Sequence, residues 1–174
     1  VYKDGADHRI FFADQIDPLF AKFYNHPDIR KILALYTGTT QPSGMVLAAR
    51  IDSVEGNVGS GGGCHRDSPI SRQFKTICYL SSVDQDAGPF QYIKGSHKKS
   101  DVLISYFKRL FTPRSSRFTN DEISLYLKCT NKKVTSALGS EGSVVHVDTK
   151  GVHRGKPIKN GSRYALTCYF LHGK

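Results

Sequence analysis

The feature that most restricts the fold of this chain is a series of short β-compatible segments, which begins near Gly44 and runs to the end. Apolar and β-branched residues mark candidate strands at residues 45–54, 74–83, 90–93, 133–138, 142–148 and 162–171. Glycine-rich turns separate these segments, and many short strands joined in this way are typical of a β-sandwich or barrel. We therefore expect a mainly β fold with flanking helices.

The first 40 residues are predicted to be helical. Asp17 is a suitable N-cap ahead of Pro18 at the first helical position, and a second apolar pattern ends near Gly38. These helices are expected to cover one outer face of the β structure.

A helical insert interrupts the strands at about residues 101–128. Leu103, Phe107 and Leu110 follow one side of its first helix, at residues 101–111, and a capping box from Thr119 to Glu122 opens the second helix. The predicted organisation is a single domain over residues 1–174, with helices in 1–40 and the β structure with its insert in 44–174.

Composition narrows the function. The chain has 174 residues, no apolar stretch long enough for a membrane span and no apolar signal-peptide segment at its start, so we expect a cytoplasmic protein. Its four cysteines form no C-x-x-C pair and are expected to be free thiols. The chain starts with valine, which is consistent with a piece of a longer protein.

The net charge of +10 favours an anionic partner. The lysines are scattered, and there is no long basic arm and no nucleic-acid signature motif. We therefore expect a small anionic molecule as the partner rather than a nucleic acid.

The residues most able to carry chemistry follow a glycine-rich loop at residues 56–63. No G-K-[ST] and no clear helix come after this loop, so we interpret it as a flexible strand connection, not a phosphate cradle. In the extended segment that follows, His65 and Asp67 are two residues apart and therefore point the same way. With His153 as a third ligand they form a facial triad, which leaves three positions on Fe(II) for a bidentate 2-oxo acid and O2.

Arg163 adds a candidate carboxylate site. It begins the last predicted strand, where it shares a face with Ala165, Thr167 and Tyr169. A guanidinium at the mouth of a barrel can hold a carboxylate through two parallel hydrogen bonds, which suits the far carboxylate of 2-oxoglutarate.

Several segments together resemble the phytanoyl-CoA dioxygenase family, within the 2-oxoglutarate oxygenase superfamily. They cover about two-thirds of the chain and are CHRDSP at 64–69, ICYL at 77–80, GPFQYIKGSH at 88–97, GSVVHVD at 142–148, His153 and GSRY at 161–164. The resemblance implies a double-stranded β-helix, a jelly roll related to cupins. It also implies Fe(II) bound by His65, Asp67 and His153, and 2-oxoglutarate bound by Arg163.

The chain departs from the superfamily pattern at one position. Many members have Ser or Thr two residues after the arginine, where this chain has Ala165. We therefore expect the hydroxyl contact to the co-substrate to be either missing or supplied by another residue, with Thr76 and Thr167 as the candidates. Related halogenases have a small residue in place of the carboxylate; the presence of Asp67 therefore favours hydroxylation of a C–H bond. The insert is expected to shape the substrate entrance.

Two other functions remain open on the sequence. A metal-dependent hydrolase on a cupin-like barrel would use the same three ligands to activate water. A non-catalytic barrel would bind an anionic ligand through its basic surface. The sequence does not name the substrate, and it leaves the roles of His97 and His146 open, whereas His8, His26 and His172 are expected at the surface or in packing.

Overall fold

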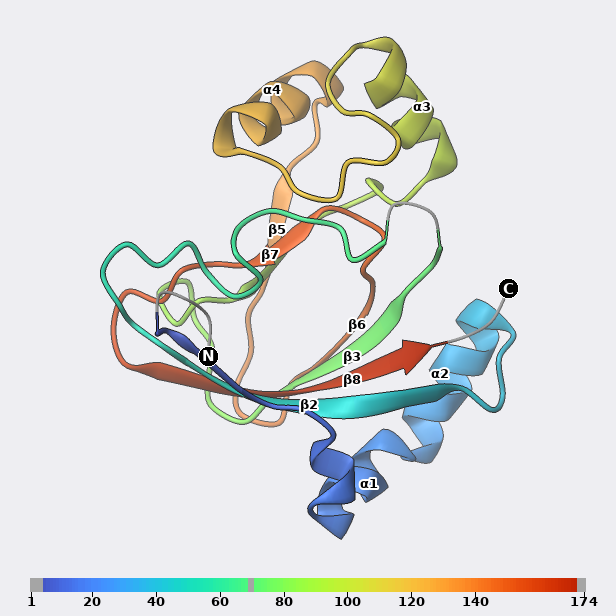
Figure 1. The fold of residues 1–174 in the computed structure, drawn as a ribbon, viewed down its shortest axis with the longest axis vertical. Helices are drawn as coiled ribbons and strands as arrows, with labels where there is room; N and C mark the ends of the chain where they lie inside the picture. Colours follow the sequence, from blue (N-terminus) through green and yellow to red (C-terminus); the bar gives the residue numbers. More distant parts are fainter. Residues whose placement is uncertain (1–4, 69–70, 172–174) are drawn as a thin grey trace.

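The β-strands form two antiparallel sheets that face each other (Figure 1). The computed structural model describes residues 5–68 and 71–171. The larger sheet has the order β1-β2-β8-β3-β6 and the smaller sheet has the order β5-β4-β7. Their bounds are β1 Asp7–Ile10, β2 Ser43–Asp52, β3 Phe74–Tyr79, β4 Phe90–Ile93, β5 Val134–Ala137, β6 Val144–Asp148, β7 His153–Gly155 and β8 Ser162–Leu171. This is the predicted jelly-roll architecture.

The two faces of the larger sheet have different neighbours. In β3, whose six residues are all buried, Phe74 and Cys78 belong to a cluster that packs under the helices. Ile77 and Tyr79 alternate with them and pack toward the smaller sheet. The inner face of β3 and β8 therefore forms the floor of the space between the sheets.

Helices α1 (Pro18–Tyr24) and α2 (Pro27–Thr37) cover the outer face, as predicted. The Asp17 carboxylate accepts a hydrogen bond from the backbone N–H of Leu19 at 2.8 Å and caps α1. Gly38, with φ 76°, ends α2 in the left-handed conformation that favours glycine. Ile29 and Leu33 of α2 are buried against the sheet.

The prediction that residues 1–40 are helical is wrong for the segment before α1. Strand β1 pairs with β2 from Asp7↔Ile51 to Ile10↔Ala48, and a 3-10 turn follows at Ala13–Gln15. The strand is short and mostly polar, and its conformation depends on the edge that β2 offers to it. A local sequence pattern carries no sign of that edge.

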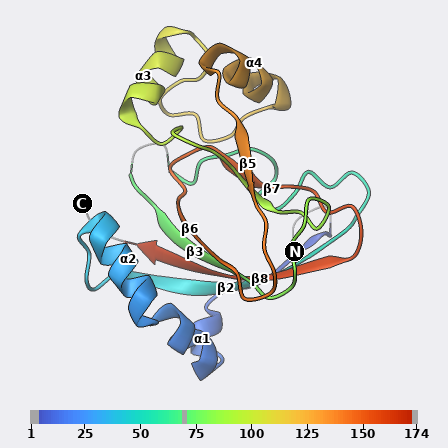
Figure 2. The same cartoon turned by 180° about the vertical axis from the view of Figure 1, so that it is seen from behind.

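The insert forms α3 (Lys99–Phe107) and α4 (Asn120–Thr130) at the end of the molecule opposite α1 (Figures 1 and 2). The predicted capping box of Thr119 and Glu122 is present. The prediction that Leu103 and Phe107 line one apolar side with Leu110 is only partly right. Leu110 is buried beyond the end of α3, whereas Leu103 and Phe107 are largely exposed.

A polar contact explains the orientation of α3. Asp101 is buried on its inner side, where it accepts a hydrogen bond from the Tyr126 hydroxyl at 2.5 Å and pairs with Lys132 at 3.1 Å. Because this buried carboxylate must face its partners, the apolar side of α3 points outward.

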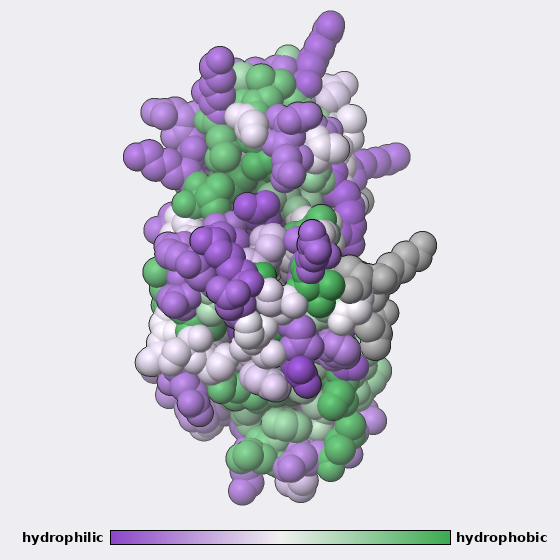
Figure 3. Space-filling view, turned by 90° about the vertical axis from the view of Figure 1, so that its left-hand side faces the viewer, coloured by the Kyte–Doolittle hydropathy of each residue, from purple (hydrophilic) through white to green (hydrophobic). Residues whose placement is uncertain are grey.

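The surface is mixed. Figure 3 shows hydrophobic side chains at the lower end of the molecule, where α1 lies in Figure 1. Ile16 and Leu19, just before and within α1, are among the most exposed large hydrophobic residues.

None of the helices within residues 5–68 and 71–171 is long and apolar enough to cross a membrane. The four cysteines are free, as predicted.

Candidate metal centre

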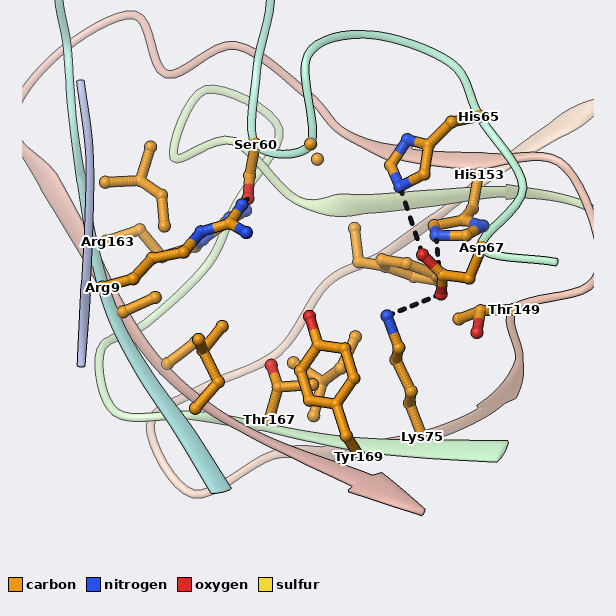
Figure 4. A pocket seen from close by; sticks show the side chains of 18 of the residues that line it. Arg9, Ser60, His65, Asp67, Lys75, Thr149, His153, Arg163, Thr167 and Tyr169 are labelled. Atoms are coloured by element: carbon orange, nitrogen blue, oxygen red, sulfur yellow. Dashed lines mark hydrogen bonds and ion pairs between the residues drawn. The ribbon is translucent and has the colours of Figure 1, made fainter. Parts of the chain in front are cut away.

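The segment with His65 and Asp67 lies between the glycine-rich loop and β3, alongside β7. The N–H and C=O groups of His65 exchange two hydrogen bonds with those of His153, both at 2.9 Å. The Asp67 N–H donates to the carbonyl of Thr149 at 3.0 Å. Main-chain pairing therefore brings His153 next to His65 and Asp67, from which it is far apart in the sequence. The side chains of His65 and Asp67 point the same way, as predicted (Figure 4).

The helical insert holds the other side of this segment. The N–H of Arg66 donates to the carbonyl of Ser116 at 2.8 Å, and the N–H of Phe118 donates to the carbonyl of Cys64 at 3.0 Å. The Arg66 guanidinium is buried over the rings of Phe111 and Phe118, 5.8 and 5.3 Å from their centroids. The insert thus supports the backbone of the candidate ligands, a role that the sequence pattern did not indicate.

The three candidate ligands have the geometry of a metal site. One ligand atom from each of His65, Asp67 and His153 lies within 4.8 Å of the others. Each imidazole Nε2 is 3.7 Å from an oxygen of Asp67. The Nδ1 atoms are 2.9 Å from the carbonyls of Gly63 and Gly151, so each Nδ1–H donates and each Nε2 keeps its lone pair for a metal.

The charges also fit a divalent cation. Burial lowers the pKa of both His65 and His153, so both imidazoles are neutral at pH 7. Burial alone would raise the pKa of Asp67, but the positive charge of Lys75 and its hydrogen bond to the carboxylate outweigh burial and hold that pKa below its usual value. Two neutral imidazoles and one carboxylate form the ligand set of non-haem Fe(II) sites.

The glycine-rich loop packs closely against these ligands and is more than a connection between strands. Gly61 has φ +86°, and a Cβ there would lie 2.3 Å from Cε1 of His65. A Cβ at Gly59 would lie 1.9 Å from the carbonyl oxygen of Gly155. Glycine is needed at both positions because the backbone lies close to β7 at Gly59 and close to the His65 ring at Gly61.

A cavity of about 310 Å³ extends from the candidate ligands to Arg163 (Figure 4). The Arg163 side chain is 6% exposed, and its Nε and Nη1 have no hydrogen-bond partner among the residues that the structure describes. Ala165, Thr167 and Tyr169 line the same cavity, which confirms the predicted face of β8. A buried guanidinium with unpartnered donors fits a carboxylate ligand.

Thr76, which was a candidate for contact with the co-substrate, and the histidines whose roles were left open lie away from the cavity. Thr76 points to the opposite face of β3, away from the cavity, where its hydroxyl is 3.0 Å from Nδ1 of His146. His97 is 3.2 Å from the hydroxyl of Tyr92 and does not line the cavity either. His8 and His26 are exposed, and His172 lies outside the described residues.

Of the basic residues that line the cavity, only Arg163 was predicted, and two of the others lie beside predicted site residues. Lys75 of β3 has its Nζ 2.5 Å from Oδ2 of Asp67, and Arg9 of β1 lies beside Arg163 (Figure 4). A lysine inside a strand whose other residues are mostly apolar is unusual, and this was a signal in the sequence. Arg9 gave no such signal because its strand was not predicted.

No protein-family model matches the chain, and no curated protein matches it in sequence. Solved structures do match its fold. The epimerase SnoN from nogalamycin biosynthesis, in complex with Fe3+, alpha ketoglutarate and nogalamycin RO, superposes with a TM-score of 0.67 at 14% identity, over 95% of this chain and 63% of SnoN. The alpha ketoglutarate dependent carbocyclase SnoK gives 0.65 at 17% identity, over 98% and 66%.

HygX from Streptomyces hygroscopicus, with nickel, 2-oxoglutarate and hygromycin B bound, gives a TM-score of 0.61 at 14% identity, over 96% of this chain and 70% of HygX. The chain thus spans about two-thirds of the length of these proteins. At these identities the likeness concerns the fold, and it confirms that this chain is a mainly β jelly roll of the kind found in non-haem, 2-oxoglutarate-dependent enzymes.

Proposed function

We propose that the protein is an Fe(II)- and 2-oxoglutarate-dependent oxygenase that hydroxylates a C–H bond of a small anionic molecule. One observation carries the proposal: His65, Asp67 and His153 converge at one end of a cavity that also holds the Arg163 guanidinium, whose Nε and Nη1 have no partner among the described residues. The solved structures with this fold that contain iron or nickel together with 2-oxoglutarate support it.

Each part of the cavity has a role in this proposal. His65, Asp67 and His153 would hold Fe(II) and leave positions open for 2-oxoglutarate and O2, which together supply the oxidising chemistry. Arg163 would pair with the far carboxylate of 2-oxoglutarate and orient it. The apolar side chains of Ile77 and Phe90, which also line the cavity, would limit the access of water.

The charge of the cavity supports an anionic substrate. Among the residues that the structure describes, its lining includes one acid, Asp67, and a larger set of basic side chains: Arg9, Arg66, Lys75, Arg117 and Arg163. The charge of Arg9 is offset by the buried Asp7, whose carboxylate lies 2.5 Å from it, which leaves four basic side chains against Asp67. Two negative charges from 2-oxoglutarate would leave a positive excess once a divalent metal is bound. A substrate with a carboxylate or phosphate group would reduce that excess.

The finer assignments are part of the same proposal. The motifs from residue 64 to residue 164 favour the phytanoyl-CoA dioxygenase family within the superfamily, and the presence of Asp67 favours hydroxylation. The structural neighbours include an epimerase and a carbocyclase, so product analysis is needed to identify the reaction. The free cysteines support a reducing, cytoplasmic setting.

Anaerobic titration with Fe(II) and then 2-oxoglutarate tests the proposal. The wild type should develop the visible charge-transfer band of a 2-oxo acid chelated to iron, and His153→Ala should not. The exposed His26 gives a matched control, since His26→Ala should retain the band. A folded, iron-loaded wild type without a band would exclude the oxygenase and favour the hydrolase or the non-catalytic barrel.

A further inference from the structure

Lys75 is a buried cation placed beside the candidate metal site. Its side chain is 8% exposed, and its Nζ is 2.5 Å from Oδ2 of Asp67. The same Nζ lies 3.9 Å from the centre of the Tyr169 ring, which is directly across from it on β8. A buried ammonium is costly unless it is paired, and here the carboxylate and the ring face compensate its charge.

A metal ion would change this balance. Asp67 is the only acid that lines the cavity in the described part of the chain, so Lys75 and a divalent cation would depend on the same carboxylate. The two cations would also repel each other across a short distance in a site with little water. Lys75 would then need a second anion, and its neighbours on the inner face of β3, Ile77 and Tyr79, offer none.

An anionic ligand on the metal would supply that charge. A 2-oxo acid brings a carboxylate to the open positions of a facial-triad metal. Arg163 lies apart from the triad in the cavity and is suited to the far carboxylate (Figure 4). This leaves Lys75 as the cation nearest to the carboxylate at the metal.

We propose that Lys75 exchanges Asp67 for the carboxylate of the 2-oxo acid, and that this exchange couples metal binding to co-substrate binding. The inference rests on the proposed function. Without the co-substrate, Lys75 competes with the metal for Asp67 and weakens metal binding. With the co-substrate, Lys75 stabilises the complex of metal and 2-oxo acid, and by linkage each ligand tightens the binding of the other.

The alternative is that Lys75 is a structural counter-ion that holds Asp67 in position. The two roles predict opposite effects of Lys75→Met on the binding of metal alone. Loss of a competitor strengthens metal binding, whereas loss of a positioning contact weakens it.

Binding of Mn(II) without O2, followed by the electron paramagnetic resonance signal of the free ion, distinguishes them without any turnover. In the wild type, saturating 2-oxoglutarate should tighten Mn(II) binding about 10-fold or more, a typical size for coupling between two sites. In Lys75→Met and Lys75→Gln, Mn(II) alone should bind about 5-fold tighter than in the wild type, and the tightening by 2-oxoglutarate should fall by about 5-fold or more, to what direct chelation of the metal leaves.

Controls separate this inference from the proposed function. Lys133→Met removes an exposed lysine and should behave like the wild type, and Lys75→Arg keeps the charge and should retain coupling. Circular dichroism and thermal unfolding establish that each variant is folded. Weaker binding of Mn(II) alone in Lys75→Met, or a wild type that binds both ligands independently, would overturn the inference. A wild type that binds neither ligand would instead contradict the proposed function.

Discussion

The two ends of the cavity differ in how their buried charges are compensated. One end holds the candidate ligands His65, Asp67 and His153 and is called the metal end here. There, Asp67 is paired with Lys75, and both imidazoles donate to backbone carbonyls. At the other end, the Arg163 guanidinium has two nitrogens without a partner in the described structure. Arg66 next to these ligands also has two nitrogens without a partner in the described structure, but its guanidinium lies over the rings of Phe111 and Phe118. The charge of Asp67 is therefore compensated by Lys75, whereas the unpaired nitrogens of Arg163 carry a desolvation cost that an anionic ligand would relieve.

The largest predicted effect is that of Arg163→Met on the binding of 2-oxoglutarate. Removal of one partner of a buried charge pair should weaken 2-oxoglutarate binding to the metal-loaded protein about 100-fold. Mn(II) alone should bind as in the wild type, because the triad is untouched. The apoprotein should be at least as stable, since a buried unpaired charge is removed.

Isothermal titration calorimetry of Arg163→Met measures both affinities, and thermal unfolding measures the stability. Arg50 of β2 is exposed, so Arg50→Met is a suitable control that should bind 2-oxoglutarate normally. Unchanged 2-oxoglutarate affinity in Arg163→Met would show that the two ends do not share one ligand.

Acid should reduce the stability of the folded protein mainly through the residues of the metal end and not through Arg163. The pKa values of His65 and His153 are lowered by burial, so below about pH 6.5 the unfolded chain binds protons that the folded chain does not. Stability is then fully present above that pH and decreases as the pH falls, by up to about 1.4 kcal/mol per pH unit for each histidine. Asp67, whose pKa is also lowered, adds a loss in the same direction at lower pH.

Urea unfolding of the apoprotein between pH 7 and pH 5 measures this loss. His153→Gln should show a smaller slope of stability against pH than the wild type, because one of the two groups that take up protons is gone. An equal slope in the two proteins would mean that other groups carry the acid sensitivity.

The fold was more predictable than the surroundings of the site. The bounds of β4 and β8 follow from apolar runs that end at turn residues, and the capping box fixes the start of α4. Strand β1 could not be predicted because its conformation depends on pairing with β2. The orientation of α3 depends on the buried contact of Asp101 with Tyr126, which joins residues 25 positions apart.

Within the site too, residues placed by a local pattern could be predicted, whereas residues placed by long-range contacts could not. His65, Asp67 and Arg163 follow from the alternation of side chains along extended segments, and this rule holds without knowledge of the fold. Thr76 was expected to be able to replace a hydroxyl near the co-substrate, but alternation along β3 places it on the outer face, opposite Lys75. Arg9 and the support of Arg66 by the insert depend on long-range contacts that no local pattern encodes.

A matched pair of glycines tests how rigidly the loop must hold the metal end. Gly61 and Gly63 have nearly equal φ angles, +86° and +90°, so alanine costs similar backbone strain at both. A Cβ at Gly61 meets the His65 ring at 2.3 Å, whereas a Cβ at Gly63 meets nothing within 4 Å. Gly61→Ala should weaken Mn(II) binding about 10-fold relative to Gly63→Ala, as expected for displacement of a ligand side chain. Equal affinities would mean that the His65 ring is free to move.

The smallest expected effect distinguishes the two threonines that were candidates for the missing hydroxyl. Thr167 lines the cavity on the same face as Arg163, whereas Thr76 contacts His146 on the opposite face. Both changes to valine preserve shape, and loss of one neutral hydrogen bond should weaken 2-oxoglutarate binding about 5-fold in Thr167→Val. Thr76→Val should leave this affinity unchanged and lower only the unfolding free energy, because it disrupts the contact with His146. If calorimetry gave the reverse order, 2-oxoglutarate would not lie along the inner face of β8, and the assignment of Arg163 as its carboxylate partner would fail with it.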